Sequence, residues 1–69
     1  MKPVKIVTEY ITLGQMLKVA DCIDSGGQAK AFLAEATITV NGAPENRRGR
    51  KLYRGDRIRV EGHGEFEIV

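Results

Sequence analysis

Two short amphipathic segments dominate the first half of the chain, and both begin with the same helix-starting signal. Residues 12–15 read Thr-Leu-Gly-Gln and residues 25–28 read Ser-Gly-Gly-Gln. In such a capping box, the hydroxyl and the Gln side chain satisfy backbone groups that a helix start leaves unpaired. The pattern predicts two helices joined by a connection over residues 21–24. Helices this short are unstable alone, so both must pack against other elements.

Apolar residues recur at helical spacing within each segment. They are Leu13, Met16, Leu17 and Ala20 in the first segment, and Ala29, Phe32, Leu33 and Ala36 in the second. Each set forms one stripe, so each helix is expected to bury one face. Ile23, in the connection, is expected to point inward as well.

The second half of the chain alternates polar and apolar residues, which is typical of strands with one buried face. The predicted strands cover residues 37–40, 52–53, 57–60 and 65–68, with a β-branched strand over 4–8. Turns are predicted at Asn41-Gly42, Gly55-Asp56 and Gly62–Gly64, and Asn-Gly is the strongest hairpin signal because both residues tolerate positive φ. The sequence therefore predicts one α+β domain over residues 1–69, with two short helices packed on a small, mostly antiparallel sheet.

A chain of 69 residues excludes several classes of function. Chains of this size bury only about 60% of their unfolded surface, which leaves little room for a deep catalytic cleft. No P-loop, dinucleotide-binding motif or carboxylate pair is present. Cys22 and His63 are the only residues of their types, so a zinc site or an internal disulfide cannot be built. We expect no enzyme activity, cofactor, metal or small-molecule substrate.

The location of the protein is also constrained by the sequence. No apolar run is long enough for a membrane span or a signal peptide. The single cysteine, Cys22, fits a reducing compartment. We therefore expect a cytoplasmic protein that does not engage membranes.

Positive charge is concentrated between residues 47 and 59. Seven of the eleven Lys and Arg residues lie there with one acid, Asp56, giving a local net charge of +6. The preceding 46 residues carry −1 and the last ten carry −3, which gives +2 for the whole chain. A block of this kind indicates an anionic partner more clearly than the total charge does.

The order of these elements resembles the S4 RNA-binding domain, and in particular small bacterial proteins that consist of little else. The resemblance covers residues 13–60 and is carried by Leu13, Leu17, Ser25, Ala29, Lys30, Leu33, Val40-Asn41-Gly42, Gly55-Asp56, Ile58 and Val60. It implies an α+β fold that grips structured RNA with the helix pair and the adjacent loop. The chain departs from the family where Gly26 follows Ser25, a position that is often Arg, and where Thr12 and Gly14 replace Arg and Asp. The basic loop is expected to offset these losses.

The basic loop over residues 47–51 supplies the first candidate RNA contacts. They are Arg47, Arg48, Arg50 and Lys51. A solvated loop that only keeps the protein soluble is the alternative reading. We favour a phosphate-binding patch, because the planar fork of Arg donors matches phosphate oxygens and Gly49 allows close approach.

The helices supply the remaining candidates. Lys30 lies in the second helix where the family meets RNA, Lys18 lies on the first, and Gly26 and Gly27 expose backbone N–H groups to a phosphate. Gln28 is read first as a capping residue and second as a base contact. Asn41 is read first as a turn residue that also adjoins RNA.

Three further residues are predicted to have structural roles. Arg57 and Arg59 are expected to form cross-strand ion pairs with Glu65 and Glu67. Tyr53 is assigned a packing role, with stacking on a base as the alternative.

The sequence thus predicts non-enzymatic binding of structured RNA, with ribosomal RNA or a ribosome-associated RNA as the expected partner. The alternative is a protein-interaction adaptor whose basic loop meets an acidic protein surface. A third reading is an accessory domain for an enzyme encoded elsewhere.

Overall fold

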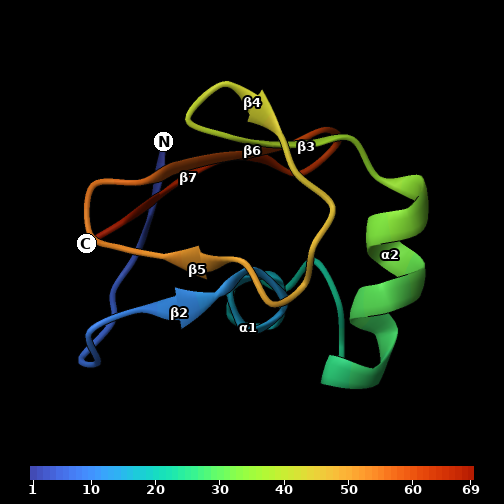
Figure 1. Ribbon diagram of the computed structural model, residues 1–69, viewed down its shortest axis with the longest axis horizontal. Coiled ribbons are helices and arrows are strands. Elements are labelled where there is room, and N and C mark those ends of the chain that lie inside the picture. Colours follow the sequence, from blue (N-terminus) through green and yellow to red (C-terminus); the bar gives the residue numbers. More distant parts are fainter.

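Two helices pack against a five-stranded sheet in a computed structural model that describes all residues, 1–69 (Figure 1). The helices are α1 (Leu13–Val19) and α2 (Ala29–Glu35), and a 3₁₀ turn, Gly26–Gln28, leads into α2. The large sheet runs across the top of the view, with α1 seen end-on below it and α2 at its right. The predicted α+β class is confirmed. Neither helix has the length and apolar character that crossing a membrane requires.

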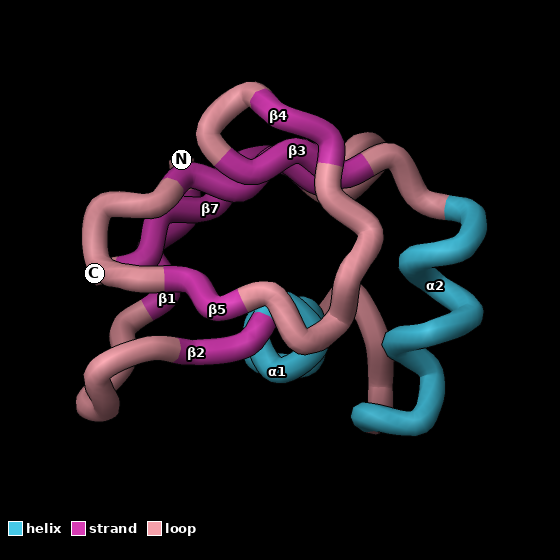
Figure 2. Tube along the Cα trace, viewed as in Figure 1, coloured by secondary structure: helices cyan, strands magenta, loops and turns pink.

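The large sheet is almost entirely antiparallel. Its strands, in spatial order, are β1 (Lys2–Val4), β7 (Gly64–Ile68), β6 (Arg57–Val60), β3 (Ile38–Val40) and β4 (Ala43–Pro44). The exception is β1, which pairs parallel to β7 and places Val4 opposite Ile68. A separate two-stranded sheet joins β2 (Ile11–Thr12) to β5 (Lys51–Leu52) beside α1 (Figure 2).

The N-terminal strand differs from the prediction. Strand β1 ends at Val4, and the chain then leaves the sheet, so the expected strand over residues 4–8 is wrong. One backbone contact follows β1, because the N–H of the buried Ile6 donates to the Val69 carbonyl at 3.1 Å, but Val7 is already 93% exposed. The predicted strand over 52–53 is shifted by one residue, because its pairing with β2 ends at Leu52.

Both helix starts carry the predicted capping devices. The Gln15 N–H donates to Thr12 Oγ1 at 3.3 Å, and the Thr12 N–H donates to Gln15 Oε1 at 3.1 Å, so the first box is complete. In the second box Gln28 Oε1 accepts from the backbone N–H of Asp24 at 2.6 Å and of Ser25 at 3.2 Å. The side chain of Gln28 is therefore engaged in capping, its favoured role.

The core is a single cluster of 16 buried residues, all of them apolar. It draws on one stripe of each helix and on the inward positions of the strands. Its largest fully buried side chains are Leu13, Met16, Leu17, Leu52, Ile58, Ile68, Val40 and Val60. Ile23 is buried as predicted, while Phe32, Ala20 and Ala36 pack against the margin of the cluster.

The Asn41-Gly42 hairpin is confirmed. Asn41 has φ 52° and Gly42 has φ 86°, both in the left-handed region that these residue types tolerate. The Asn41 side chain also joins this turn to β6: its Nδ2 donates to Asp56 Oδ1 at 3.1 Å, and its Oδ1 accepts from the Arg57 N–H at 2.9 Å. The turn is therefore fixed by its side chain as well as by its backbone.

Candidate nucleic-acid interface

The basic loop is seated directly on the start of α1. The Leu13 N–H donates to the Arg50 carbonyl at 2.8 Å, and the Gly14 N–H donates to the Arg48 carbonyl at 2.9 Å. These are two of the N–H groups that a helix start leaves without partners. The carbonyl groups of the loop thus accept hydrogen bonds from the first N–H groups of α1, and these bonds fix the path of the loop.

Gly14 makes this close seating possible. A Cβ atom on Gly14 would lie 3.4 Å from both the Cβ and the carbonyl oxygen of Arg48, and 3.6 Å from the Cβ of Ala29. A methyl group would just fit there, but a longer side chain would meet the loop. Glycine at position 14 therefore has a physical reason, because the loop occupies the space that a longer side chain would need.

Arg48 lies between two adjoining surface hollows, each of about 380 Å³, and we call the pair the Arg48 surface. The first hollow is formed by the starts of both helices and the loop. It is lined by Thr12, Gly14, Gln15, Lys18, Gly26, Ala29, Arg48 and Gly49. The second is lined by Lys30, Leu33, Ala34, Asn46 and Arg48. Three segments of the chain therefore bring Lys18, Lys30 and Arg48 to one surface, and no acidic residue lines either hollow.

Glu45 divides the basic loop into two kinds of residue. Its carboxylate accepts from Arg50 Nη1 at 2.7 Å and from Arg47 Nη2 at 2.9 Å. Its side chain is only 6% exposed, and its Oε2 also accepts from the backbone N–H groups of Asn46 and Arg47. Hydrogen bonds from Arg47 and Arg50 hold the pKa of Glu45 far below its ordinary value. The charges of Arg47 and Arg50 are thus partly neutralised, whereas Arg48 takes part in no ion pair.

Lys51 is directed to a different neighbour. Its ammonium lies 4.9 Å from the centre of the Tyr10 ring, a cation–π geometry. The Tyr10 ring in turn lies 6.1 Å from that of Tyr53. Tyr53 is 45% exposed, so it is not a core residue, and its packing is limited to this surface contact.

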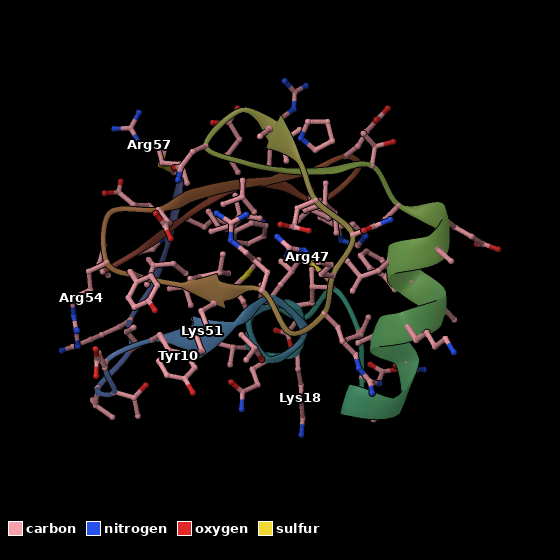
Figure 3. All side chains as sticks on the ribbon, viewed as in Figure 1. Tyr10, Lys18, Arg47, Lys51, Arg54 and Arg57 are labelled. Atoms are coloured by element: carbon pink, nitrogen blue, oxygen red, sulfur yellow. The ribbon has the colours of Figure 1, made fainter.

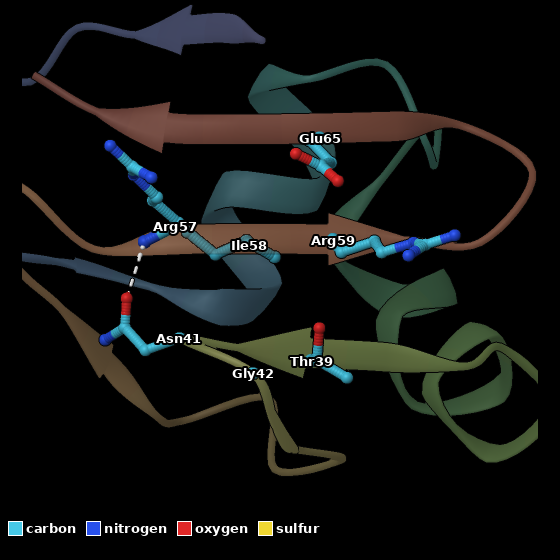
Figure 4. Close-up of a pocket in the computed structure, with 7 residues that line it drawn as sticks. All are labelled: Thr39, Asn41, Gly42, Arg57, Ile58, Arg59 and Glu65. Atoms are coloured by element: carbon cyan, nitrogen blue, oxygen red, sulfur yellow. Dashed lines mark hydrogen bonds between the residues drawn. The ribbon is translucent and has the colours of Figure 1, made fainter.

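The cross-strand ion pairs predicted on the sheet do not form. The register is as expected, with Arg57 opposite Glu67 and Arg59 opposite Glu65. Figure 4 shows the Arg59 side chain extending along β6 and the Arg57 side chain reaching obliquely toward β7, both away from Glu65, and the structure contains no ion pair there. On a twisted, solvated sheet face, long side chains gain little by pairing, so register alone does not produce a bridge.

That outer sheet face carries the largest hollow, of about 570 Å³, lined by Thr39, Asn41, Gly42, Arg57, Ile58, Arg59 and Glu65. It contains Asn41, which is separated from the Arg48 surface and whose polar atoms are engaged by Asp56 and Arg57. Its two arginines stand opposite Glu67 and Glu65 in the strand register, and Glu65 also lines the hollow, so its positive charge is reduced. We therefore do not assign the candidate interface here, although this is the larger hollow.

The remaining predicted residues lie at the edge of the interface. Gly26 lines the Arg48 surface, whereas Gly27 and Gln28 line a neighbouring hollow together with Cys22 and Phe32. Cys22 is partly buried, and this burial raises the pKa of its thiol, as expected for an unreactive cysteine. The structure thus brings together Arg48, Lys18, Lys30 and Gly26, and separates them from Asn41.

Two features of the interface were not predicted. Glu45 stands two residues before Arg47, and counting charge from residue 47 onward left it out of the basic segment. Gly14 was noted only as a departure from the family. A glycine inside the first turn of a predicted helix is itself a signal of close approach by another segment.

Two short helices on a mostly antiparallel sheet, with a loop docked on the first helix start, define an α+β domain of the S4 type. The sequence model of the S4 domain family matches residues 4–69. The chain belongs to this family, and the match extends beyond the predicted 13–60 at both ends.

Curated relatives agree with this assignment. The chain is 60% identical over 67 residues to the "Probable ribosome maturation protein RlbA" of Bacillus subtilis, covering 97% of this chain and 94% of that protein. It is 35% identical over 54 residues to the "Putative RNA-binding protein YbcJ" of Escherichia coli, covering 78% of this chain and 77% of that protein.

Proposed function

We propose that this protein binds structured RNA, without enzymatic activity, and that the Arg48 surface is its main contact. The observation that carries this proposal is the convergence of Lys18, Lys30 and Arg48 on two hollows without an acidic residue. Arginine and lysine donors at such a surface bind phosphate oxygens. Gly26 is exposed and has no side chain, so the RNA backbone can approach it closely.

The proposed ligand is ribosomal RNA or an RNA of a ribosome-assembly intermediate. The name of the Bacillus subtilis relative, a probable ribosome maturation protein, supports this choice. A-form helices expose mainly phosphates and 2′-hydroxyls in their accessible groove, so a small basic surface reads RNA shape rather than sequence. The RNA would then contact five further residues at the margin of the Arg48 surface: Arg47, Arg50, Lys51, Gly27 and Gln28.

The test is binding of a structured ribosomal RNA fragment at two salt concentrations, with an unstructured RNA of equal length as the control ligand. A Lys18/Lys30/Arg48→Ala variant removes three cations from the interface. A matched Lys5/Arg57/Arg59→Ala variant removes three exposed cations elsewhere and so has the same net charge. We expect the first variant to lose affinity and to reduce the salt slope by about 2, at roughly 0.7 per phosphate contact.

Equal losses in the two variants would show that only net charge matters and would overturn the proposed surface. Failure of the wild-type protein to bind any RNA at physiological salt would favour the adaptor function, with an acidic protein as the partner. Circular dichroism would establish that each variant is folded before its affinity is compared.

A further inference from the structure

The two tyrosines of this protein form an exposed aromatic pair. Tyr10 directly precedes β2 and Tyr53 directly follows β5, and their ring centroids lie 6.1 Å apart at 51°. They are 38% and 45% exposed, whereas Phe66 is buried and Phe32 packs against the core. The core therefore accommodates the phenylalanines and leaves both tyrosines at the surface.

The position of Tyr53 is fixed by its backbone. Its N–H donates to Asp56 Oδ2 at 2.8 Å, and the neighbouring Arg54 donates to the Ile6 carbonyl at 2.8 Å. The first anchor lies within the turn that follows β5, and the second ties this turn to the segment after β1 through the Arg54 guanidinium. The aromatic pair is thus held on an ordered segment, which lowers the entropic cost of using it as a binding surface.

The aromatic pair adjoins the Arg48 surface. Strand β5 places Lys51 directly opposite Thr12, and Thr12 lines the first hollow of that surface. Lys51 reaches over the Tyr10 ring at 4.9 Å and so carries a positive charge to the pair. In Figure 3, Tyr10 and Lys51 lie together on the same side of the molecule as Lys18, while Arg57 lies on the opposite side.

We propose that the Tyr10–Tyr53 pair stacks an unpaired base of the bound RNA while Lys51 contacts the phosphate of that nucleotide. This inference rests on the proposed RNA-binding function and specifies its ligand. Aromatic stacking accepts any base, because every base has a π face, but it requires that the base be free of its own duplex. The preferred ligand is therefore an RNA helix with an unpaired nucleotide at its edge, rather than a continuous duplex.

The experiment compares two RNA hairpins that share one stem, one blunt and one with a single-stranded adenosine extension. Affinity is measured for wild-type protein and for Tyr10→Ala, Tyr53→Ala and Tyr53→Phe variants. We expect the extension to tighten wild-type binding roughly tenfold. Both Ala variants lose that gain, and Tyr53→Phe keeps it because the stacking ring remains. Neither Ala substitution changes the salt slope, which depends on the cations.

Proton NMR supplies a readout that needs no variant. The chain has two Tyr and no Trp, so the tyrosine ring signals report on this surface alone. Stacking of a base moves these signals upfield, and the blunt hairpin should move them less than the extended one. If the extension adds no affinity, or if the ring signals stay in place while the extended hairpin is bound, the stacking proposal is wrong and the Arg48 surface stands.

Failure of the proposed RNA-binding function can be distinguished from failure of the stacking proposal. If neither hairpin binds, the proposed function fails, and a titration with oligoadenylate alone then tests the tyrosine pair by the same NMR signals. Upfield shifts in the oligoadenylate titration would show that the tyrosine pair stacks bases although the protein does not bind the duplex. Unchanged signals would overturn both proposals.

Discussion

The Glu45 carboxylate accepts a hydrogen bond of 2.7 Å from the guanidinium of Arg50, and only 6% of the Glu45 side chain is exposed. This contact lies inside the segment that gives the protein its positive charge. Glu45 pairs with the side chains of Arg47 and Arg50, whereas the side chain of Arg48 takes part in no ion pair. The charge available to a ligand is consequently smaller than the count of basic residues indicates.

A Glu45→Gln substitution is expected to destabilise the protein by about 1 kcal/mol, because it replaces charge-assisted hydrogen bonds with neutral ones. Gln retains an oxygen for the backbone N–H groups of Asn46 and Arg47, so the loop should keep its path. Urea unfolding of the two proteins measures the difference. A Glu65→Gln variant, which removes a charge from an unpaired surface position, serves as the control and should unfold like the wild type.

The contribution of Glu45 should also depend on pH. Its pKa is lowered by folding, so the unfolded state binds more protons and stability rises with pH. The contribution is complete above the ordinary pKa of 4.5 and is lost as the pH falls below that value. Unfolding free energies measured between about pH 7 and pH 3 should therefore fall more steeply for the wild type than for Glu45→Gln. Parallel pH profiles for the two proteins would contradict the assignment.

Single arginine substitutions should separate the interface from the outer sheet face. Arg48→Ala is expected to weaken binding of a structured RNA several-fold and to reduce the salt slope by about 0.7 to 0.9, one phosphate contact. Arg59→Ala removes the same charge from an exposed position on β6 and should leave the slope unchanged. A larger effect from Arg59 than from Arg48 would place the interface on the sheet instead.

Gly14 offers a steric test of how the loop is seated. Gly14→Ala adds a Cβ at 3.4 Å from Arg48, an ordinary contact, so stability should change by no more than about 1 kcal/mol, including the gain in helix propensity. Gly14→Val adds two further carbons that must displace the Arg48 backbone. We expect the Val variant to unfold at lower urea and to shift the amide NMR signals of residues 47–50. If Val is tolerated as well as Ala, the loop is not confined by Gly14.

Asn41 was predicted to contact RNA, and its two side-chain hydrogen bonds suggest a different role. Asn41→Ala loses both bonds and places a Cβ-bearing residue without local compensation at positive φ, which together should cost about 2 kcal/mol. Asn41→Gly loses the bonds but tolerates the backbone angle, so it should be affected less. Both variants, once folded, should bind RNA like the wild type. Weaker binding by a folded Asn41→Gly protein would instead identify Asn41 as a contact.

Features that depend on local sequence were predictable. The capping boxes at Thr12 and Ser25, the helical stripes and the Asn41-Gly42 turn each rest on residues within a few positions of one another. The phase of β6 and β7 followed from alternation alone, because one face had to be buried. Local physical rules were sufficient for these elements.

Features that depend on a distant partner were not predictable. The residues after Val4 have the composition of a strand, yet the last backbone contact of this segment with the chain after β7 is made by Ile6, with Val69. The β2–β5 pairing joins only two residues on each side, too few to show an alternating pattern. The separation of Arg57 from Glu67 is a matter of rotamers and solvation, which register does not determine.

The basic loop is positioned by its main chain, so its path does not depend on which side chains it carries. Main-chain groups of Leu13, Gly14, Arg48 and Arg50 set the course of the loop, and none of these bonds requires a charged side chain. Arginine at position 48 can in principle be exchanged for a neutral, acidic or aromatic residue with little change in backbone path. Substitutions at position 48 can therefore change which ligand the loop binds, with little loss of folding stability.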